Sequence, residues 1–262
     1  MLQVKVKILY NKKIKGNYFH LVIQAPKITK ESLPGQFLNI KVNDADEPLL
    51  RRPFSIHRVR GANVELLYEV VGEATKVLSQ RKPGEYLDVI GPLGNGFQLN
   101  TKHKTLNILV AGGMGVAPLI FLAEKLRERT PNTEHRTPLV LIGAKTKSQV
   151  LCTKKFQDLG CEVKVATDDG SRGFKGNITD LFRNLVSSIE YRVSSIYACG
   201  PRPMLKEISW ISKKYKMPAQ ISLEEHMACG IGACLGCVVN TKEGFKRVCK
   251  EGPVFKADEI VW

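Results

Sequence analysis

Residues 227–237 read Met-Ala-Cys-Gly-Ile-Gly-Ala-Cys-Leu-Gly-Cys, and one more cysteine follows at position 249. The spacing of these cysteines is C-x4-C-x2-C-x11-C, and the residues are Cys229, Cys234, Cys237 and Cys249. A plant-type [2Fe–2S] cluster is held by C-x4-C-x2-C and a distant fourth cysteine. Glycines within the run allow the backbone to curl, so that its N–H groups point at sulfurs. The segment therefore predicts a cluster that handles single electrons.

A structural zinc site is the alternative for four cysteines, because it also uses four thiolates. Zinc sites usually combine one C-x2-C pair with a second pair of short spacing. In this chain the second short-spaced pair is missing, since Cys249 follows Cys237 only after eleven residues. The spacing favours the iron–sulfur interpretation.

The composition indicates a globular protein. The chain has 262 residues, and 43% of them are hydrophobic, which is enough for well-formed cores. The net charge of +15 comes from 40 Lys and Arg against 25 Asp and Glu. Such a charge attracts anions, but the basic residues are scattered and are not interleaved with the aromatic residues of a base-stacking platform. A solvated basic surface is favoured over nucleic-acid binding.

The sequence also predicts a cytoplasmic protein. The first residues, MLQVKVKILYNKKIKG, alternate apolar and charged side chains, and they lack the apolar core of a signal peptide. No stretch reaches the length of a membrane-spanning helix. Seven cysteines, four of them in a metal pattern, fit a reducing compartment better than a disulfide framework.

The pattern along the chain predicts a multi-domain protein with three parts. Residues 1–100 read as short alternating strands separated by turns such as Pro34-Gly35 and Pro83-Gly84, which is typical of an antiparallel β-barrel. Residues 101–222 alternate apolar strands with helices, which predicts a parallel sheet covered by helices on both faces. Residues 223–262 form a small C-terminal cysteine module.

Two motifs in the first part suit a phosphate-bearing ligand. The run Arg51-Arg52-Pro53-Phe54-Ser55-Ile56 offers an arginine fork for a pyrophosphate and a hydroxyl for the polar edge of a flavin. An ordinary exposed strand start explains it equally well. The run Gly72-Glu73-Ala74-Thr75 offers N–H groups and a hydroxyl to a phosphate, or else simply caps a helix.

Two strand-to-helix junctions in the second part suit a dinucleotide. Gly112, Gly113 and Gly115 follow an apolar strand and open a helix, which places N–H groups against phosphates. The ordinary G-x-G-x-x-G fingerprint is absent, and a tight packing turn is the alternative. Cys199-Gly200 follows another strand, so that Cys199 contacts a nicotinamide ring or is a buried small residue.

Taken in chain order, the motifs resemble one family. They are RRPFSI, the Gly-x-x-Thr strand end, GPLGNGF, GGMGVAP, TDDGS, CGPRPM, EEHMACGIGACLGC and RVCKEGPVF. The chain is similar to the electron transfer subunit of NAD-dependent, class 1B dihydroorotate dehydrogenase, a branch of the ferredoxin reductase superfamily. The resemblance implies an FAD-binding barrel, an NAD-binding α/β domain and a [2Fe–2S] module. The implied partner is an FMN-containing catalytic subunit that oxidises dihydroorotate in pyrimidine synthesis, in a heterotetramer with two copies of each chain.

The resemblance also implies which residues bind FAD. They are Arg52, Pro53, Phe54, Ser55, Leu67, Tyr68, Glu69, Gly72, Ala74 and Thr75. Glu69 and Ala74 differ from the arginine and glycine expected at those positions, and Glu69 brings a negative charge toward an anionic cofactor. In the NAD-binding part, Asp168 ends a strand that borders the adenosine ribose, where a carboxylate accepts the ribose hydroxyl and repels a 2′-phosphate. NADH is therefore expected to be preferred over NADPH.

The implied activity needs no acid/base pair on this chain, and no catalytic residue is assigned. A hydride brings two electrons, a cluster accepts one at a time, and a flavin exchanges both. Dihydroorotate is expected to bind on the partner. The first alternative is a ferredoxin–NADP or sulfide-linked reductase subunit of the same superfamily. The second is a non-redox module in which zinc fills the four cysteines.

Overall fold

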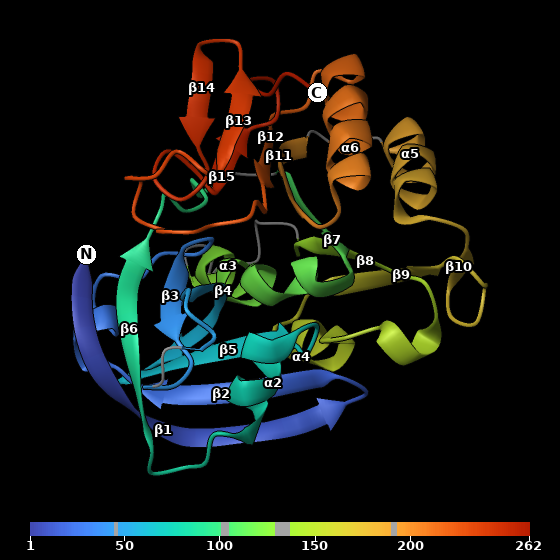
Figure 1. The fold of residues 1–262 in the computed structure, drawn as a ribbon. Coiled ribbons are helices and arrows are strands. Elements are labelled where there is room, and N and C mark those ends of the chain that lie inside the picture. The colour runs from blue at the N-terminus through green and yellow to red at the C-terminus, as the bar shows by residue number, and fades with distance from the viewer. Residues whose placement is uncertain (45–46, 101–104, 129–136, 190–192) are drawn as a thin grey trace. The chain divides into compact units, whose positions relative to one another are not determined.

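The computed structural model describes residues 1–44, 47–100, 105–128, 137–189 and 193–262, and Figure 1 shows its fold. The chain separates into two compact units. One contains Met1–Gly96, Glu224–Val239 and Phe245–Pro253; the other contains Phe97–Leu223, Asn240–Gly244 and Val254–Trp262. The three-part division at residues 100 and 222 stays a prediction.

Six strands of the first unit close into an antiparallel barrel, in the order β1-β2-β5-β4-β3-β6. They are β1 Leu2–Lys15, β2 Tyr18–Gln24, β3 Phe37–Lys41, β4 Arg52–Arg60, β5 Asn63–Glu69 and β6 Tyr86–Leu93. The predicted antiparallel barrel is therefore confirmed. Alternation of side chains builds it: in β1, Val6 and Ile8 are buried while Lys5 and Lys7 are exposed.

Strand β1 is longer than the sequence pattern indicates. The alternation of apolar and charged residues ends near Leu9, and the residues that follow Asn11 are exposed and mostly basic. The strand nevertheless continues to Lys15, because irregularities in pairing between Ile8 and Tyr10 and between Lys13 and Lys15 let it stay in register with β2. A bulge of this kind bends a strand without ending its pairing, and hydrophobic periodicity does not show it.

Two short helices belong to the barrel unit, α1 Pro26–Thr29 and α2 Glu73–Gln80. Helix α2 follows β5, where the sequence predicted a helix after Gly72. It buries Ala74 and Leu78 and exposes its polar residues. The helix therefore packs through one apolar stripe, and its first turn lies at the end of a barrel strand.

The second unit is built on a seven-stranded sheet in the order β10-β9-β8-β7-β11-β12-β15. Its strands are β7 Leu106–Gly112, β8 Leu139–Ala144, β9 Glu162–Thr167, β10 Phe174–Lys175, β11 Val193–Cys199, β12 Ala219–Ser222 and β15 Val254–Lys256. All neighbours are parallel except β12 and β15. Every residue of β7 and β11 is buried, as expected for strands covered on both faces. The predicted parallel sheet is confirmed, and β10 and β15 are additions.

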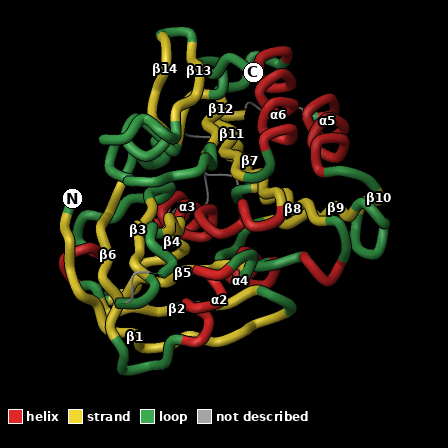
Figure 2. Tube along the Cα trace, viewed as in Figure 1, coloured by secondary structure: helices red, strands yellow, loops and turns green. Residues whose placement is uncertain are grey.

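The helices of the sheet unit form two pairs, as Figures 1 and 2 show. They are α3 Val116–Glu128, α4 Thr153–Asp158, α5 Ile178–Ser188 and α6 Arg202–Lys214, with short 3₁₀ turns at Gly113–Gly115 and Lys147–Gln149. Right-handed crossovers along this strand order place α3 and α4 on one face and α5 and α6 on the other. Among the described residues, no helix combines the length and apolar character that crossing a membrane requires.

The cysteine-bearing segments contain little regular structure. The strands β13 Val238–Thr241 and β14 Gly244–Arg247 form a two-stranded sheet, and the cysteines lie in the loops before and after it. Figure 2 shows these loops in green. We call residues 229–237 the first cysteine loop and residues 247–251 the second cysteine loop. Both loops belong to the barrel unit.

Candidate electron-transfer site

The first cysteine loop takes a backbone path that only glycine allows at two positions. Gly230 has φ +68° and Gly232 has φ +87°, which L side chains rarely adopt. A Cβ atom on Gly230 would lie 2.3 Å from Nδ2 of Asn39, and one on Gly232 would lie 2.7 Å from the side chain of Lys250. These glycines therefore suit the left-handed turn, and an added Cβ atom would also displace the side chain of Asn39 or of Lys250.

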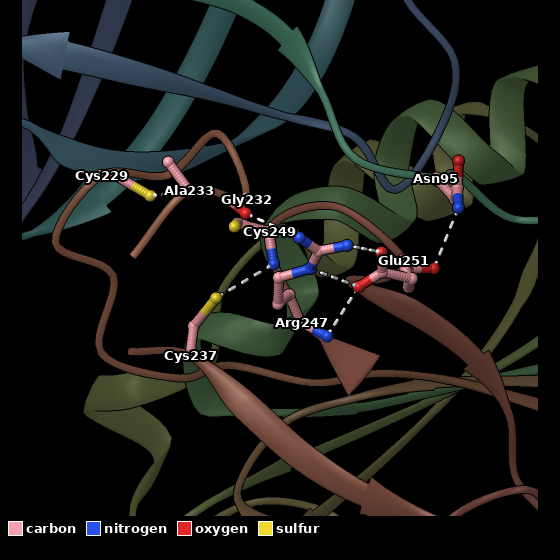
Figure 3. Close-up of polar contacts among 8 residues, drawn as sticks. All are labelled: Asn95, Cys229, Gly232, Ala233, Cys237, Arg247, Cys249 and Glu251. Atoms are coloured by element: carbon pink, nitrogen blue, oxygen red, sulfur yellow. Dashed lines mark hydrogen bonds and ion pairs between the residues drawn. The ribbon is translucent and has the colours of Figure 1, made fainter. Parts of the chain in front are cut away.

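The four cysteines lie as two pairs. Sγ of Cys229 accepts the backbone N–H of Cys234, at 3.4 Å, and of Ala233, at 3.3 Å. Sγ of Cys237 accepts the backbone N–H of Cys249 at 3.4 Å, as Figure 3 shows. Side-chain hydrogen bonds also join Cys229 to Cys234 and Cys249 to Cys237. In the described part of the chain, no three His, Cys, Asp or Glu side chains converge to hold a single metal ion.

The two pairs differ in exposure and charge. Cys237 and Cys249 are each 2% exposed, whereas Cys234 is exposed and Cys229 is half-buried. Burial raises the pKa of Cys229, but backbone N–H groups led by that of Ile231 outweigh this and lower the pKa to about 6. Burial and the neighbouring Cys237 raise the pKa of Cys249 to about 12. Cys229 therefore forms a thiolate more readily than Cys249.

These observations fit a [2Fe–2S] cluster. Such a cluster takes protein ligands on each of two irons, and the four thiols are arranged as two pairs. Backbone N–H groups already point at the sulfurs of both pairs, which is how proteins stabilise cluster sulfurs. The other three cysteines are separate: Cys152, Cys161 and Cys199 belong to the sheet unit, and burial raises the pKa of Cys152 and of Cys161 to about 11.

The barrel holds the first cysteine loop through a side chain that the sequence did not single out. Asn39, in β3, is 1% exposed, and its Nδ2 donates to the carbonyl of Cys229 at 3.0 Å. An asparagine inside a strand is unusual, and that is the one signal that reading the sequence offers. The contact fixes the backbone at the first cysteine.

The two arginines of the predicted pyrophosphate fork have different partners. Arg51 forms an ion pair with Asp88 at 2.9 Å and donates to the carbonyl of Asp88 at 2.8 Å. Arg52 donates to the carbonyl of Leu50 at 2.6 Å and to that of Arg51 at 3.2 Å. Arg51 is thus held by β6, and Arg52 bends back over its own chain at the start of β4.

The strand predicted to line the flavin ring is buried. Leu67 and Tyr68 are 3% and 2% exposed, so their side chains belong to the core. Tyr68 Oη donates to Oδ1 of Asn11 at 3.0 Å, and burial raises the pKa of Tyr68. Glu69 is half-buried, and its charge, after burial itself, raises the pKa of Tyr18. Among the other predicted residues, Phe54 packs edge-on against Tyr68.

The Gly-x-x-Thr run acts as a helix cap. Oγ1 of Thr75 accepts the backbone N–H of Val71 at 3.0 Å and of Gly72 at 3.1 Å, and it donates to the carbonyl of Gly72 at 2.9 Å. Ala74 is 4% exposed, beneath this turn. The hydroxyl therefore caps the helix within its own loop, and its contact with an FAD phosphate stays a prediction.

The two junctions predicted to bind a dinucleotide meet at the carboxyl ends of β7 and β11. A Cβ atom on Gly115 would lie 1.9 Å from the carbonyl oxygen of Cys199, and one on Gly200 would lie 2.9 Å from the backbone nitrogen of Gly112. Gly113 has φ +54°. The glycines thus allow two backbones to touch where ligands bind in open α/β sheets. Cys199 is 1% exposed, as a buried small residue is.

The two carboxylates that follow β9, those of Asp168 and Asp169, differ in their hydrogen-bond partners. Oδ1 of Asp169 accepts the backbone N–H of Ser171 at 2.9 Å and its hydroxyl at 2.6 Å. Asp168 is exposed, and its backbone N–H donates to the carbonyl of Ala144 at 3.1 Å. Because β9, β8 and β7 are parallel neighbours, Asp168 lies at the same sheet edge as Gly112.

The paired thiols of the barrel unit suit a group that carries single electrons. The glycine junction at the carboxyl ends of the parallel strands suits a nucleotide. This barrel and sheet are the fold of the ferredoxin reductases, and the class is an NAD-linked oxidoreductase. A solved structure with this fold is that of an NADH-dependent reduced ferredoxin-NADP oxidoreductase, described for flavin-based electron bifurcation. It is 30% identical, with a TM-score of 0.85 over 98% of this chain and 90% of that chain.

Sequence comparison gives the family. Residues 224–261 match the iron-sulfur cluster binding domain of dihydroorotate dehydrogenase B, and residues 109–209 match an oxidoreductase NAD-binding domain. The electron transfer subunit of dihydroorotate dehydrogenase B (NAD(+)) from Desulforamulus reducens is 40% identical over 98% of this chain and 97% of its own. That of Bacillus cereus strain B4264 is 41% identical over the whole of both chains. The chain belongs to the family of electron transfer subunits of dihydroorotate dehydrogenase B.

Proposed function

We propose that this chain passes electrons between NAD(H), FAD and a [2Fe–2S] cluster, and to or from the FMN-containing catalytic subunit of dihydroorotate dehydrogenase in pyrimidine biosynthesis. The observation that carries the proposal is the arrangement of four thiols as two pairs, with backbone N–H groups pointing at their sulfurs. Membership of the family supports it. It is favoured over a ferredoxin–NADP or sulfide-linked reductase because the curated relatives match along their whole length.

The cluster is held by Cys229, Cys234, Cys237 and Cys249, one pair on each iron. The FAD is held on the barrel unit by residues 52–55, residues 67–69, Gly72, Ala74 and Thr75. Because the side chains of Leu67 and Tyr68 are buried, β5 contacts the flavin through its backbone. FAD, when bound, exchanges two electrons with a nicotinamide and single electrons with a cluster. Residues of this chain bind and orient these groups, and no side chain has to move a proton.

The nicotinamide nucleotide binds at the carboxyl ends of the parallel strands, on Gly112, Gly113, Gly115, Asp168, Cys199 and Gly200. The close approach of the two glycine junctions supports this placement, because phosphates bind against exposed backbone N–H groups. Asp168 is exposed beside the same edge, and its charge repels a 2′-phosphate. We expect a higher kcat/KM with NADH than with NADPH, and a smaller ratio in Asp168→Ser. Equal kcat/KM values for the two nucleotides with the unaltered protein would contradict the assignment.

The catalytic partner carries the dihydroorotate site, and the complex contains two copies of each chain. The seven cysteines, all among the described residues, form no disulfide, which supports a reducing cytoplasm as the location of the chain. Size measurement of the purified complex by light scattering tests the stoichiometry. A mass corresponding to one copy of each chain would contradict the heterotetramer.

The experiment that tests the function uses the purified chain with and without the catalytic subunit. Alone, it should show flavin and iron–sulfur absorption, reduce artificial acceptors with NADH and leave dihydroorotate unchanged. With the catalytic subunit, dihydroorotate oxidation should become coupled to NAD reduction. A colourless protein that contains zinc, turnover of dihydroorotate by the chain alone, or failure to bind the catalytic subunit would contradict the proposal.

A further inference from the structure

Arg247 contacts both cysteine loops. Its guanidinium holds the carboxylate of Glu251 in a two-point contact, Nε to Oε2 at 3.0 Å and Nη2 to Oε1 at 2.5 Å. Its third nitrogen, Nη1, donates to the carbonyl of Gly232 at 2.7 Å. Gly232 lies in the first cysteine loop and Glu251 in the second, so one planar group spans both, as Figure 3 shows.

Gly232 connects this arginine to the cysteine ligands. Its backbone N–H hydrogen-bonds the thiol of Cys249, while its carbonyl accepts from Arg247. The same residue packs closely on the side chain of Lys250, which would have to move to admit a Cβ atom. A displacement of Arg247 therefore shifts the residue that donates to the fourth cysteine.

Glu251 is fixed to the barrel unit in turn. Its carbonyl accepts Nδ2 of Asn95 at 2.9 Å, and the backbone N–H of Asn95 donates to the carbonyl of Gly252 at 2.6 Å. Its carboxylate also accepts the backbone N–H of Arg247 at 2.7 Å. Both side chains are only partly exposed, 26% for Arg247 and 31% for Glu251, so solvent screens the pair incompletely.

We propose that Arg247 is a positioning residue that fastens the two cysteine loops together around the cluster, and that the Arg247–Glu251 pair sets the cluster's reduction potential by presenting balanced charges beside it. We call the two loops, joined in this way, the cysteine cage. The inference deepens the proposed function, because it takes the four cysteines as the cluster ligands.

The fork and the charge have separable effects. A lysine keeps the positive charge but cannot make the planar two-point contact or reach three acceptors at fixed angles. Adding an electron to a cluster is favoured by a nearby positive charge and opposed by a negative one. Removing Arg247 leaves Glu251 uncompensated, whereas removing the charge of Glu251 leaves Arg247 uncompensated. The two changes must shift the reduction potential in opposite directions.

The test measures the reduction potential of the cluster and its rate of iron loss to a chelator, in the purified chain with its cofactors. Arg247→Gln should lower the potential and Glu251→Gln should raise it, while the double variant returns it close to the original value. All three should lose iron faster, because removing a group that orients metal ligands typically lowers metal affinity by about 10–100-fold. Arg247→Lys should keep the potential and still lose iron faster.

A matched control is Arg183→Gln, which breaks the Arg183–Glu207 ion pair between α5 and α6 in the sheet unit. It should change neither quantity. Unaltered potentials in both single variants, shifts of the same sign, or iron loss from Arg247→Lys at the original rate would overturn the inference. Absence of cluster absorption from the unaltered protein would instead contradict the proposed function. If Arg247→Gln retains no cluster, Glu251→Gln and Arg247→Lys still decide the matter.

Discussion

The two cysteine loops of the cage and the C-terminal end of helix α2 are held in place by different kinds of contact. In the cage, an ionised arginine and glutamate join two loops of little regular structure. At the C-terminal end of α2 the contacts are between neutral groups: Nδ2 of Asn11 donates to the carbonyls of Leu78 and Arg81 at 2.8 and 3.0 Å, and its Oδ1 accepts from Tyr68.

The difference matches what each region is proposed to hold. A charge beside a cluster changes its potential, so charged supports serve the cage in two ways at once. An FAD phosphate needs a helix start that stays in place, and neutral hydrogen bonds at the other end of α2 hold the helix against β1 without adding a charge. Changes to one region should therefore leave the cofactor of the other region in place.

The largest expected effect is loss of the cluster. Cys249→Ser replaces a proposed ligand by a hydroxyl, which binds iron far less well than a thiolate, so the paramagnetic signal of the reduced cluster should be abolished or distorted. FAD content, measured by flavin absorption after acid release, should stay unchanged. Cys161→Ser, in the sheet unit, is the matched control and should leave the signal intact. A normal signal from Cys249→Ser would remove this residue from the ligand set.

Next in size is the effect of Arg52→Ala on FAD. If Arg52 contacts the pyrophosphate by a charge-assisted bond, FAD affinity should fall by about 1.5–3 kcal/mol, or roughly 10–150-fold. Titration of the flavin-free protein with FAD measures this, and cluster iron should be retained. Arg51→Ala is the neighbouring control: Arg51 is engaged by Asp88, so that variant should bind FAD normally. Equal affinity of the Arg52 variant and the unaltered chain would refute the contact.

Removal of Asn11 should weaken α2 specifically. Asn11→Leu leaves the carbonyls of Leu78 and Arg81 and the hydroxyl of Tyr68 without this partner, which should lower the free energy of unfolding by about 1–3 kcal/mol. FAD affinity should fall with it, since α2 loses its tie to β1. Tyr68→Phe removes one bond of the three and should cost less. Iron loss at the original rate in both variants would confirm that the two regions are independent, and faster loss would break the comparison.

The smallest effect expected is that of pH on the Arg51–Asp88 pair, a charged contact outside the cage. Burial raises the pKa of Asp88, but hydrogen bonds from Arg51 and Gln3 outweigh it and hold the pKa below its ordinary value. The stabilisation is therefore fully present above the ordinary aspartate pKa of about 3.9 and is lost as pH falls through the lowered value. An exposed or partly exposed pair contributes about 0.2–1 kcal/mol.

Urea unfolding of the unaltered chain and of Asp88→Asn at neutral and acidic pH measures this contribution. The two proteins should differ at neutral pH and converge in acid. A difference that grows as the pH falls would mean that the pair does not stabilise the barrel.

Local sequence patterns were enough to predict the barrel, the parallel sheet and the cluster-type cysteine spacing. Alternation over β1 to β6, apolar runs such as β7 and the C-x4-C-x2-C spacing all lie within short windows. The supports of the site could not be predicted in the same way. Asn39 meets Cys229 across 190 residues of chain, and Asn95 meets Glu251 across 156, so no local pattern announces these contacts.

Two further details depended on geometry. The sequence allowed Thr75 to be a phosphate contact or a helix cap, and the capping contacts of its hydroxyl with the backbone of Val71 and Gly72 became visible only in the structure. Likewise Arg51 and Arg52 look equivalent in the sequence, and the position of Asp88 in β6 separates them. Residue type determines which groups a side chain can bind, while the fold determines which of these groups lies within contact distance.

Strand β15 gives the C-terminal segment a second role, in the parallel sheet. It follows the second cysteine loop directly and pairs antiparallel with β12, covering what would otherwise be the last edge of the parallel sheet. A chain cut after residue 253 would expose the N–H and C=O groups of β12, and open edges of this kind invite pairing between molecules and aggregation. The segment that carries the four cysteines therefore cannot be removed without disturbing the parallel sheet, because the same segment continues into β15, which pairs with β12.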